Sequence, residues 1–322
     1  MPAAPPALPS SRFLIVGAGV AGLMAASALR DAGQSVTLVD KGRAAGGRLA
    51  TRRVDGAVFD HGAQFFTARD PRLAPQLARW RAAGAVTSWF DEVLRGAQGM
   101  SSLSRHLAAG LSLTLGARVA SVARDDAGWR VTTDAGAAWR GDTVILTAPA
   151  PQSLALVDAG GVALPAALRA DLDSLAYAPC LAGLFEGAWP DPLPAHGVAP
   201  VVTEPLSWLA SNAAKGISDR PALTAHASAG WSQARWGDDD DAILSALGAA
   251  VEAVTGASAR PVALKRWRYA RPTRTLPAPL SHRDGGARLI FTGDAFDDDG
   301  GRVEGAARAG LAAAAIALRP RG

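Results

Sequence analysis

The 322-residue chain has one cysteine, two tyrosines and three lysines. With Cys180 alone, an internal disulfide and a C-x-x-C redox pair are both excluded. No apolar run reaches the roughly 20 residues that a membrane-spanning helix needs. The first residues lack the basic cluster and apolar core of a secretory signal, and their proline content predicts a disordered tail over residues 1–11. These absences favour a cytoplasmic protein.

Charge and metal ligands are also sparse. The net charge is only +4, and the basic residues, mostly arginines, alternate with acids along the chain, which is not the pattern of a nucleic-acid-binding surface. The acidic run of residues 238–241 has no histidine at ligand spacing, so we predict the solvated first turn of a helix there and no metal site. The apolar share of 49% is sufficient for a sizeable core, and the length allows two domains.

The strongest positive signal is a dinucleotide-binding fingerprint near the N-terminus. A short apolar run, residues 13–16, predicts a buried parallel strand. Three glycines at G-x-G-x-x-G spacing follow it: Gly17, Gly19 and Gly22. They permit a sharp turn, close approach of backbone to a pyrophosphate, and close packing of a helix whose N–H groups point at the phosphates. A second strand ends at Asp40, about where an acid that binds an adenosine ribose is expected.

Three further features favour FAD over NAD as the bound dinucleotide. The doublet Gly46-Gly47 allows backbone to approach the diphosphate, and the adjacent Arg48 can neutralise it. Late in the chain, a strand over residues 288–291 leads into Gly293-Asp294, where the acid can bind a ribityl hydroxyl or a diphosphate-bound water. A helix beginning at Val303 would place its positive end at the flavin ring and stabilise the reduced form.

The rest of the chain completes an α/β fold with a Rossmann-like FAD-binding domain and a second, mixed α+β substrate domain. Strands are expected near residues 111–115, 117–124, 129–133 and 142–147, with helices near residues 71–83, 100–110 and 242–255. The tryptophans and both tyrosines concentrate in residues 152–282. We therefore predict a discontinuous FAD-binding domain of residues 12–75, 99–151 and 283–322, and a substrate domain of residues 76–98 and 152–282.

The motifs in this order resemble those of the flavin amine oxidase superfamily, and most closely its renalase-like group. The resemblance covers nearly the whole chain, and its distinctive parts are HGAQFFTARD, residues 61–70, and RWRYARP, residues 266–272. It implies a non-covalent FAD, with neither His61 nor Cys180 attached to the flavin. It also implies an oxidase that moves a hydride from dihydro isomers of NAD(P) to flavin N5 and then to O2, giving hydrogen peroxide. The partners are then a small dinucleotide and O2, with the chain a monomer or weak dimer.

The resemblance also assigns residues to the cofactor. FAD is expected to contact Gly17, Gly19, Val20, Ala21, Gly22, Asp40, Lys41, Gly47, Arg48, Gly62, Ala63, Gln64, Val119, Gly293, Asp294, Arg302, Val303 and Glu304. Among these, Gln64 is expected near the reacting face of the ring, where it would position the flavin and substrate for catalysis.

Hydride loss from a dihydropyridine leaves a stable aromatic ring, so this chemistry needs a flat slot and good alignment but no strong base. Candidates for the walls of the slot, besides Gln64, are Phe65, Trp267 and Tyr269; core packing is the alternative role for these aromatic residues. Asn212 and His226 are candidates for polar contacts with substrate. The basic residues of KRWRYARPTR, Lys265 to Arg274, face alternate sides if this segment is a strand, so only some can reach a substrate phosphate.

Two features depart from the renalase-like pattern and keep alternatives open. Residues 89–100 are shorter than in that group, which would leave the substrate site more open. The loop of residues 297–301 is unusually acidic beside a flavin, so its carboxylates are expected to cap the next helix or face solvent. One alternative is an amine oxidase or desaturase, against which stand the scarce lysines and tyrosines. The other is a flavin-binding protein without catalytic activity.

Overall fold

The computed structural model describes residues 9–191, 193–200 and 203–320. The chain folds into two compact units. Unit 1 comprises residues 1–47, 107–176 and 274–322, and unit 2 comprises residues 48–106 and 177–273. Most of the predicted tail, residues 1–8, lies outside the described residues. Ser10 and Ser11 are a correction to that prediction, because they already belong to the first strand.

Unit 1 is built on an eight-stranded sheet in which the first strand lies in the middle. Its main path is β16-β17-β10-β1-β2-β7, and β9 pairs with β10 and with β8. The strands are β1 (Ser10–Val16), β2 (Val36–Val39), β7 (Ser112–Thr114), β8 (Val119–Asp125), β9 (Gly128–Thr133), β10 (Ala138–Leu146), β16 (Leu280–Asp284) and β17 (Ala287–Phe291). Because β1 is parallel to β2 and β10, and β10 is parallel to β17, the carboxyl ends of all four strands lie at one edge.

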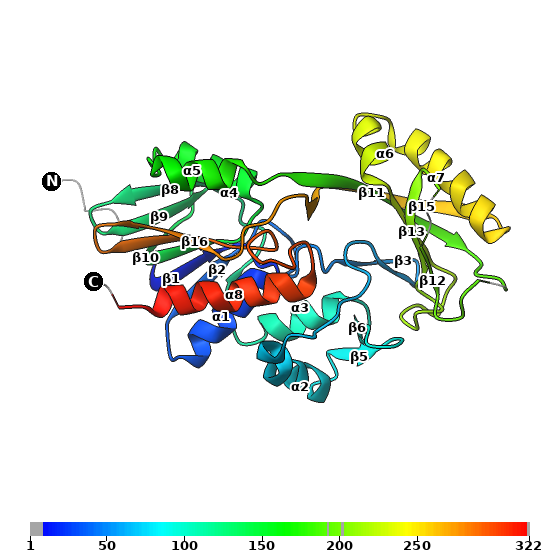
Figure 1. Ribbon diagram of the computed structural model, residues 1–322, viewed down its shortest axis with the longest axis horizontal. Coiled ribbons are helices and arrows are strands. Elements are labelled where there is room, and N and C mark those ends of the chain that lie inside the picture. The colour runs from blue at the N-terminus through cyan, green and yellow to red at the C-terminus, as the bar shows by residue number, and fades with distance from the viewer. Residues whose placement is uncertain (1–8, 192, 201–202, 321–322) are drawn as a thin grey trace. The chain divides into compact units, whose positions relative to one another are not determined.

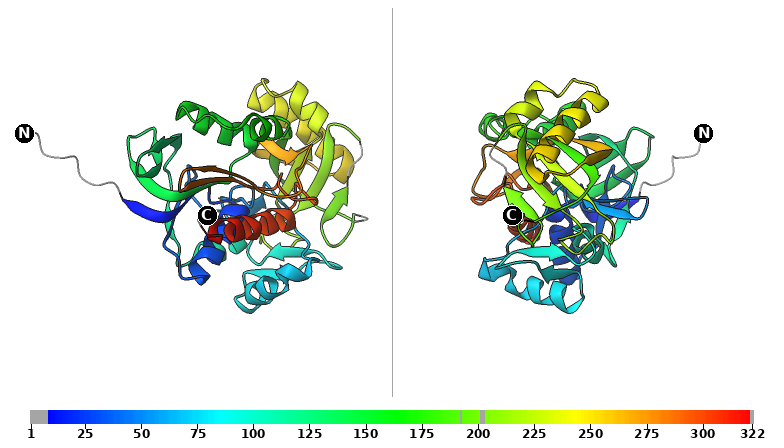
Figure 2. Two further views of the ribbon diagram at one scale, coloured as in Figure 1. Left: turned by 60° about the vertical axis from the view of Figure 1, so that its left-hand side comes forward. Right: turned by 90° about the vertical axis from the view of Figure 1, so that its right-hand side faces the viewer.

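Four helices belong to unit 1: α1 (Val20–Asp31), α4 (Ala150–Ala159), α5 (Ala166–Asp173) and α8 (Val303–Leu318). The first and last run side by side (Figure 1), and Figure 2 shows the same pair, blue and red, from another direction. Small residues permit this close packing: a Cβ on Gly310 would overlap the backbone of Ala21. The two ends of the sequence thus belong to one Rossmann-like unit.

Unit 2 has a five-stranded antiparallel sheet in the order β12-β13-β14-β11-β15 and two small hairpins. The sheet strands are β11 (Tyr177–Gly187), β12 (Val198–Pro200), β13 (Leu206–Ser211), β14 (Leu223–Ala227) and β15 (Ala259–Pro272). The hairpins pair β3 (Thr51–Val54) with β4 (Ala57–Asp60), and β5 (Val86–Ser88) with β6 (Leu94–Gly96). The helices are η1 (Pro71–Leu73), α2 (Ala74–Ala82), α6 (Ala229–Ala234), α7 (Asp240–Thr255) and α3 (Ser101–Ala108), whose last two residues belong to unit 1.

The two faces of this sheet have different coverings. On one face, Leu181, Leu209 and Leu223 pack with Leu247 and Val251 of α7. Leu184 and Ala222 pack instead with Ala57 and Phe59 of the β3–β4 hairpin. Because side chains alternate along a strand, the segment that follows β4 is carried to the face away from α7.

The bounds of the two units differ from the predicted domain bounds. Residues 48–75 and 99–106 belong with the five-stranded sheet, because the β3–β4 hairpin packs on that sheet. Residues 152–176 belong to unit 1, where α4 packs against β8, and residues 274–282 belong there too. The helices and strands expected from the sequence are present with shifts of a few residues at their ends.

Candidate functional site

The turn after β1 in unit 1 needs each of its three glycines for a different reason. Gly17 has φ 109°, and a Cβ there would overlap the hydroxyl of Thr147. A Cβ on Gly22 would overlap the carbonyl oxygen of Gly17. Gly19 has an ordinary φ of −74°, and a Cβ there would meet nothing within 4 Å. Gly19 therefore keeps a surface open at the start of α1, where no side chain caps the free N–H groups of Val20 and its neighbours.

The glycine doublet Gly46-Gly47 lies against this turn. Gly46 donates its N–H to the carbonyl of Ala18 (2.7 Å), and a Cβ on Gly47 would stand 3.5 Å from the Cα of Gly19. Asp40 ties the same loops together, because one carboxylate oxygen accepts the N–H of Ala18 (2.6 Å) and the other accepts the N–H of Gly42 (2.6 Å). Lys41 beside it is exposed, and Val119 is half-buried at the start of β8.

Residues nearly 300 positions away reach the same edge of the sheet. Thr292 donates its N–H to Leu146 (2.9 Å), and a Cβ on Gly293 would lie 3.4 Å from the carbonyl oxygen of Thr147, the residue that confines Gly17. Asp294 and Glu304 are both buried. Arg302 precedes α8, whose first turn holds Val303 and Glu304 and has no side-chain cap at Arg302. Unit 1 thus gathers three glycine-bearing segments and two helix starts at one edge of its sheet.

The acidic loop before α8 is neutralised from within unit 1. Arg308 donates to both oxygens of Asp297, and to Asp299 (2.9 Å). Asp297 is buried and also accepts the N–H of Asp299 (3.0 Å), whereas Asp298 is exposed. Asp298 faces solvent as expected, but the expected helix cap is not seen, because no side chain caps α8 at Arg302. Sequence reasoning missed the arginine, although its place one turn into the following helix was a signal.

These residues fit a dinucleotide. The open space above Gly19, the neighbouring Gly47 and the uncapped start of α1 form a cradle that side chains would fill, and which a diphosphate can enter.

In unit 2, the segment after β4 is fixed by its own backbone and by a side-chain amide. A Cβ on Gly62 would overlap the carbonyl of Arg48, which accepts the N–H of Ala63 (2.9 Å). Arg48 itself donates to the carbonyl of Ala270 on β15 (3.1 Å). The amide nitrogen of Gln64 donates to the carbonyl of Asp60 (2.6 Å), while its amide oxygen is buried without a partner.

A fully buried ion pair underlies this segment. Lys215 Nζ donates to Asp60 Oδ2 (2.6 Å) and to the backbone carbonyl of Gln64, and neither charged side chain is exposed. The other carboxylate oxygen accepts from the Thr51 hydroxyl (2.6 Å) and the Met100 N–H (2.8 Å). Burial lowers the pKa of Lys215, and the neighbouring Asp60 opposes that shift. We infer that the pair is ionic, since each charge has close partners of the right kind.

The sheet face beside this segment is aromatic. Trp208, His226, Ala182 and Lys265 follow one another across β13, β14, β11 and β15. Phe65 lies against Trp208, with ring centroids 5.5 Å apart. Among the described residues, the Trp208 indole N–H and His226 Nε2 are buried without hydrogen-bond partners.

His61 and Trp267 form a second aromatic layer on this face. Their rings stack at 5.5 Å, and the Trp267 indole donates to the carbonyl of His61 (2.7 Å). The Lys265 ammonium lies 4.9 Å from the centre of the Trp267 ring. Burial, and then Lys265, lower the pKa of His61 to about 4, and burial lowers the pKa of His226 to about 4. Both histidines are therefore uncharged at neutral pH.

Only some of the predicted substrate residues lie on this face, and one of them has its polar atoms occupied by other protein groups. Phe65, His226 and Trp267 meet there. Asn212 is fully buried, its oxygen accepts the N–H of Asp60 (3.1 Å), and its nitrogen donates to Thr224 (2.9 Å), so the structure gives it a structural role. Tyr269 packs edge-on against Tyr177 at 5.6 Å. Sequence reasoning missed Trp208, because no motif around this tryptophan marks it as part of a site.

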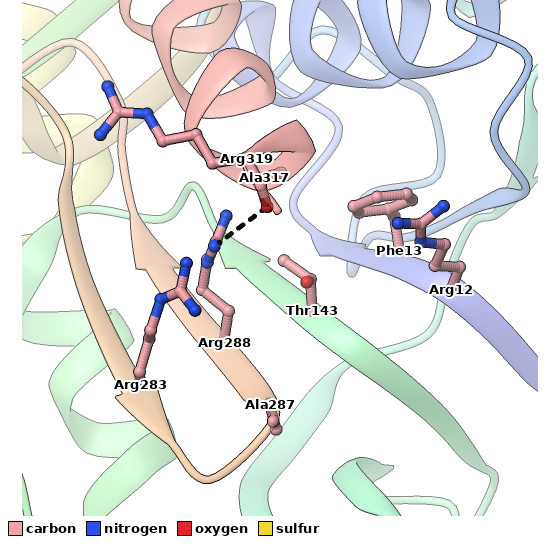
Figure 3. A pocket seen from close by; sticks show the side chains of 9 residues that line it. Arg12, Phe13, Thr143, Arg283, Ala287, Arg288, Ala317 and Arg319 are labelled. Carbon is pink, nitrogen blue, oxygen red and sulfur yellow. Dashed lines mark hydrogen bonds between the residues drawn. The ribbon is translucent and has the colours of Figure 1, made fainter. Parts of the chain in front are cut away.

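A separate hollow in unit 1 has a structural explanation. It lies near the start of β1, β10 and β17, away from the glycine turns, and four arginines are among the residues lining it (Figure 3). The buried Arg288 donates to the carbonyls of Ile316 and Arg319 (3.2 Å for the latter), and Arg283 donates to Pro320 (3.0 Å). These arginines cap the last carbonyls of α8 and complement its dipole.

Two family models match the chain. The family model described as NAD(P)-binding Rossmann-like domain matches residues 15–80, and the model described as flavin containing amine oxidoreductase matches residues 76–318. In the described part of the chain, no helix has the length and apolarity needed to span a bilayer. Nor do the described residues bring three His, Cys, Asp or Glu side chains together as metal ligands.

Solved structures agree in fold at low sequence identity. A protein from Exiguobacterium sp. 255-15, provisionally named a protoporphyrinogen oxidase, has a TM-score of 0.71 and 15% identity, covering 97% of this chain and 100% of that one. A putrescine oxidase bound to putrescine has a TM-score of 0.66 and 17% identity, with the same two coverages. Hydroxyneurosporene desaturase of Rubrivivax gelatinosus is 47% identical over 62 residues, which are 19% of this chain and 12% of the desaturase.

Proposed function

The chain belongs to the family of flavin containing amine oxidoreductases, and we propose that it is an FAD-dependent oxidase acting on dihydro isomers of NAD(P). Its family and Rossmann-like domain establish it as a flavin-dependent oxidoreductase with FAD as cofactor. The cradle around Gly17, Gly19, Gly22 and Gly47 fits the diphosphate of that cofactor. The chemistry that FAD supplies when bound is acceptance of a hydride and its transfer to O2 as hydrogen peroxide.

One observation carries the choice of substrate: the aromatic face of unit 2 carries positive charge that no local carboxylate balances. Lys265 and Arg52 both lower the pKa of His61, and Asp60, which raises it, is already paired with Lys215. A protonated amine would need a carboxylate or an open aromatic surface. Lysine ammonium groups already lie 5.0 Å from the Trp89 ring and 4.9 Å from the Trp267 ring.

A neutral, flat dihydropyridine with phosphates attached suits the same face. Phe65 and Trp208 offer aromatic surface for the ring. Three buried polar groups here have no hydrogen-bond partner among the described residues: the indole N–H of Trp208, His226 Nε2 and the Gln64 amide oxygen. They include a donor and an acceptor, both of which a carboxamide can match. Both histidines are neutral, and no strong base is required because hydride loss leaves an aromatic ring. We propose that Lys215 holds Gln64 in place while the ring is aligned.

The remaining assignments are proposals of the same kind. FAD is proposed to contact Arg48, Gly62, Ala63 and Gln64 of unit 2 in addition to the residues of unit 1. The putrescine oxidase likeness, at 17% identity, extends to the fold and does not favour an amine. The desaturase match covers too little of either chain to favour that activity.

Anaerobic mixing tests the proposal directly. The purified yellow protein is mixed with borohydride-reduced NAD, which contains several dihydro isomers, and separately with putrescine and benzylamine. We expect rapid bleaching by the dihydro isomers alone, followed on aeration by recovery of colour and one hydrogen peroxide per oxidised nicotinamide. Bleaching by an amine alone, or by none of these compounds, would overturn the assignment.

A further inference from the structure

Lys265 is a cation on the aromatic face, and within the part of the chain that the structure describes it forms no ion pair with an acid. Along β15, side chains alternate between the two faces of the sheet. Arg266 turns toward α7, where it pairs with Asp240 (2.5 Å), and Arg268 lies 5.1 Å from the ring centre of Trp236. Lys265 and Trp267 point to the other face. Among the described residues, no carboxylate lies within ion-pair distance of the Lys265 ammonium. The ammonium lies instead over the Trp267 ring.

The neighbours of Lys265 make an anion the natural partner. Ala182 lies directly across from Lys265 on β11 and also across from His226, so a methyl group separates the lysine from the neutral imidazole. Arg52 adds a second positive charge near His61, while Asp60 is held by Lys215. In this partly desolvated setting a cation without a counter-ion attracts a ligand anion more strongly than an exposed lysine would.

We propose that Lys265 determines specificity by binding a phosphate of the substrate, so that the enzyme prefers dihydro-nicotinamide nucleotides to the free dihydropyridine ring. This inference rests on the proposed function. The compact ammonium group acts as a point charge on the phosphate oxygens, as lysines commonly do in phosphate sites. Loss of one such charge-assisted bond is expected to lower kcat/KM by about 10- to 100-fold.

The strand itself supplies a matched control. Lys265→Met and Arg268→Met each remove one positive charge from β15, but from opposite faces and three residues apart. Each variant is assayed with borohydride-reduced NAD and with borohydride-reduced 1-methylnicotinamide, which has the ring but no phosphate. We expect Lys265→Met to lose about 10- to 100-fold in kcat/KM with the dinucleotide and less than about twofold with the phosphate-free ring. Arg268→Met should match the wild type with both, and Lys265→Arg should restore most of the dinucleotide rate.

A binding measurement separates this inference from the proposed function. Calorimetric titration of the FAD-loaded protein with inorganic pyrophosphate requires no turnover, and we expect binding that Lys265→Met weakens about tenfold and Arg268→Met does not change. Equal losses with both substrates, equal losses in both variants, or pyrophosphate binding that is absent or independent of Lys265 would overturn the inference. If neither dihydropyridine bleaches the wild type, the proposed function is overturned, and the pyrophosphate titration still decides the role of Lys265.

Discussion

Replacing Lys215 by methionine tests how the buried ion pair holds the segment after β4. Methionine is similar in length to lysine and fills the same space, so the change removes charge and hydrogen bonding with little loss of packing. The wild-type ammonium donates to Asp60 Oδ2 and to the Gln64 carbonyl, with both charged side chains at 0% exposure. The variant therefore leaves the Asp60 carboxylate buried without its counter-ion.

The structure sets the expected magnitude. Breaking a buried pair by removing one partner costs about 3–5 kcal/mol, because the remaining charge is uncompensated. Asp60 keeps bonds from the Thr51 hydroxyl (2.6 Å) and the Met100 N–H (2.8 Å), which places the expected loss near the lower end of that range. Lys215→Met should lower the free energy of unfolding by about 3 kcal/mol at pH 7 and Tm by on the order of 10 °C.

Urea unfolding followed by tryptophan fluorescence measures the change. Combining Lys215→Met with Asp60→Asn removes the stranded charge, so the double variant should be more stable than Lys215→Met alone. Lys41→Met, which removes an exposed lysine of unit 1, should change the free energy of unfolding by less than about 0.5 kcal/mol. A loss below about 1 kcal/mol in Lys215→Met, or strictly additive losses in the double variant, would refute the reasoning about an ionic pair.

Three further outcomes are expected. Gly19→Ala should have a free energy of unfolding within about 1 kcal/mol of the wild type, because the new Cβ meets no protein atom within 4 Å. It should nevertheless be purified without flavin colour, and retention of FAD would contradict the proposed diphosphate cradle. Stability should fall as pH drops from 6.5 toward 4, because burial holds the pKa of His61 and His226 near 4 while the unfolded chain takes up protons first; urea unfolding at pH 7 and pH 5 checks this, and His226→Gln should flatten the curve. Arg308→Leu should cost about 3 kcal/mol in thermal denaturation, since it strands Asp297, and a neutral result would mean that the loop acids are solvated.

The Rossmann-like fold of unit 1 was predictable because its signals are local in sequence. The order of strand, glycine turn, helix, strand and acid lies within residues 13–40, and each part constrains its neighbours. The late strand and helix were recognisable for the same reason. What the sequence did not reveal is how the parts bond: Asp40 accepts the N–H of Ala18 and Gly42, and Thr147 confines Gly17 from more than a hundred residues away.

Unit 2 was harder to predict because its important pairs are distant in sequence. Asp60 and Lys215 are 155 positions apart, and nothing around the lysine marks it as buried. Asn212 was a reasonable polar candidate from the sequence, but the N–H of Asp60 and the hydroxyl of Thr224 occupy its amide. Whether a polar side chain is available to a ligand depends on its remaining hydrogen bonds, which only the folded structure specifies.

One strand of unit 2 did carry a signal in its sequence. The alternation of KRWRYARP predicts two sets of side chains on opposite faces, and the acidic run that opens the helix of residues 240–255 is complementary to one set. Arg266 indeed pairs with Asp240, and Leu264 of the same parity packs with the α7 cluster. The set without an acidic partner, Lys265 and Trp267, is then left on the face away from that helix. Charge complementarity between an amphipathic helix and a strand can therefore identify which set of strand side chains packs on the helix and which set lies on the other face.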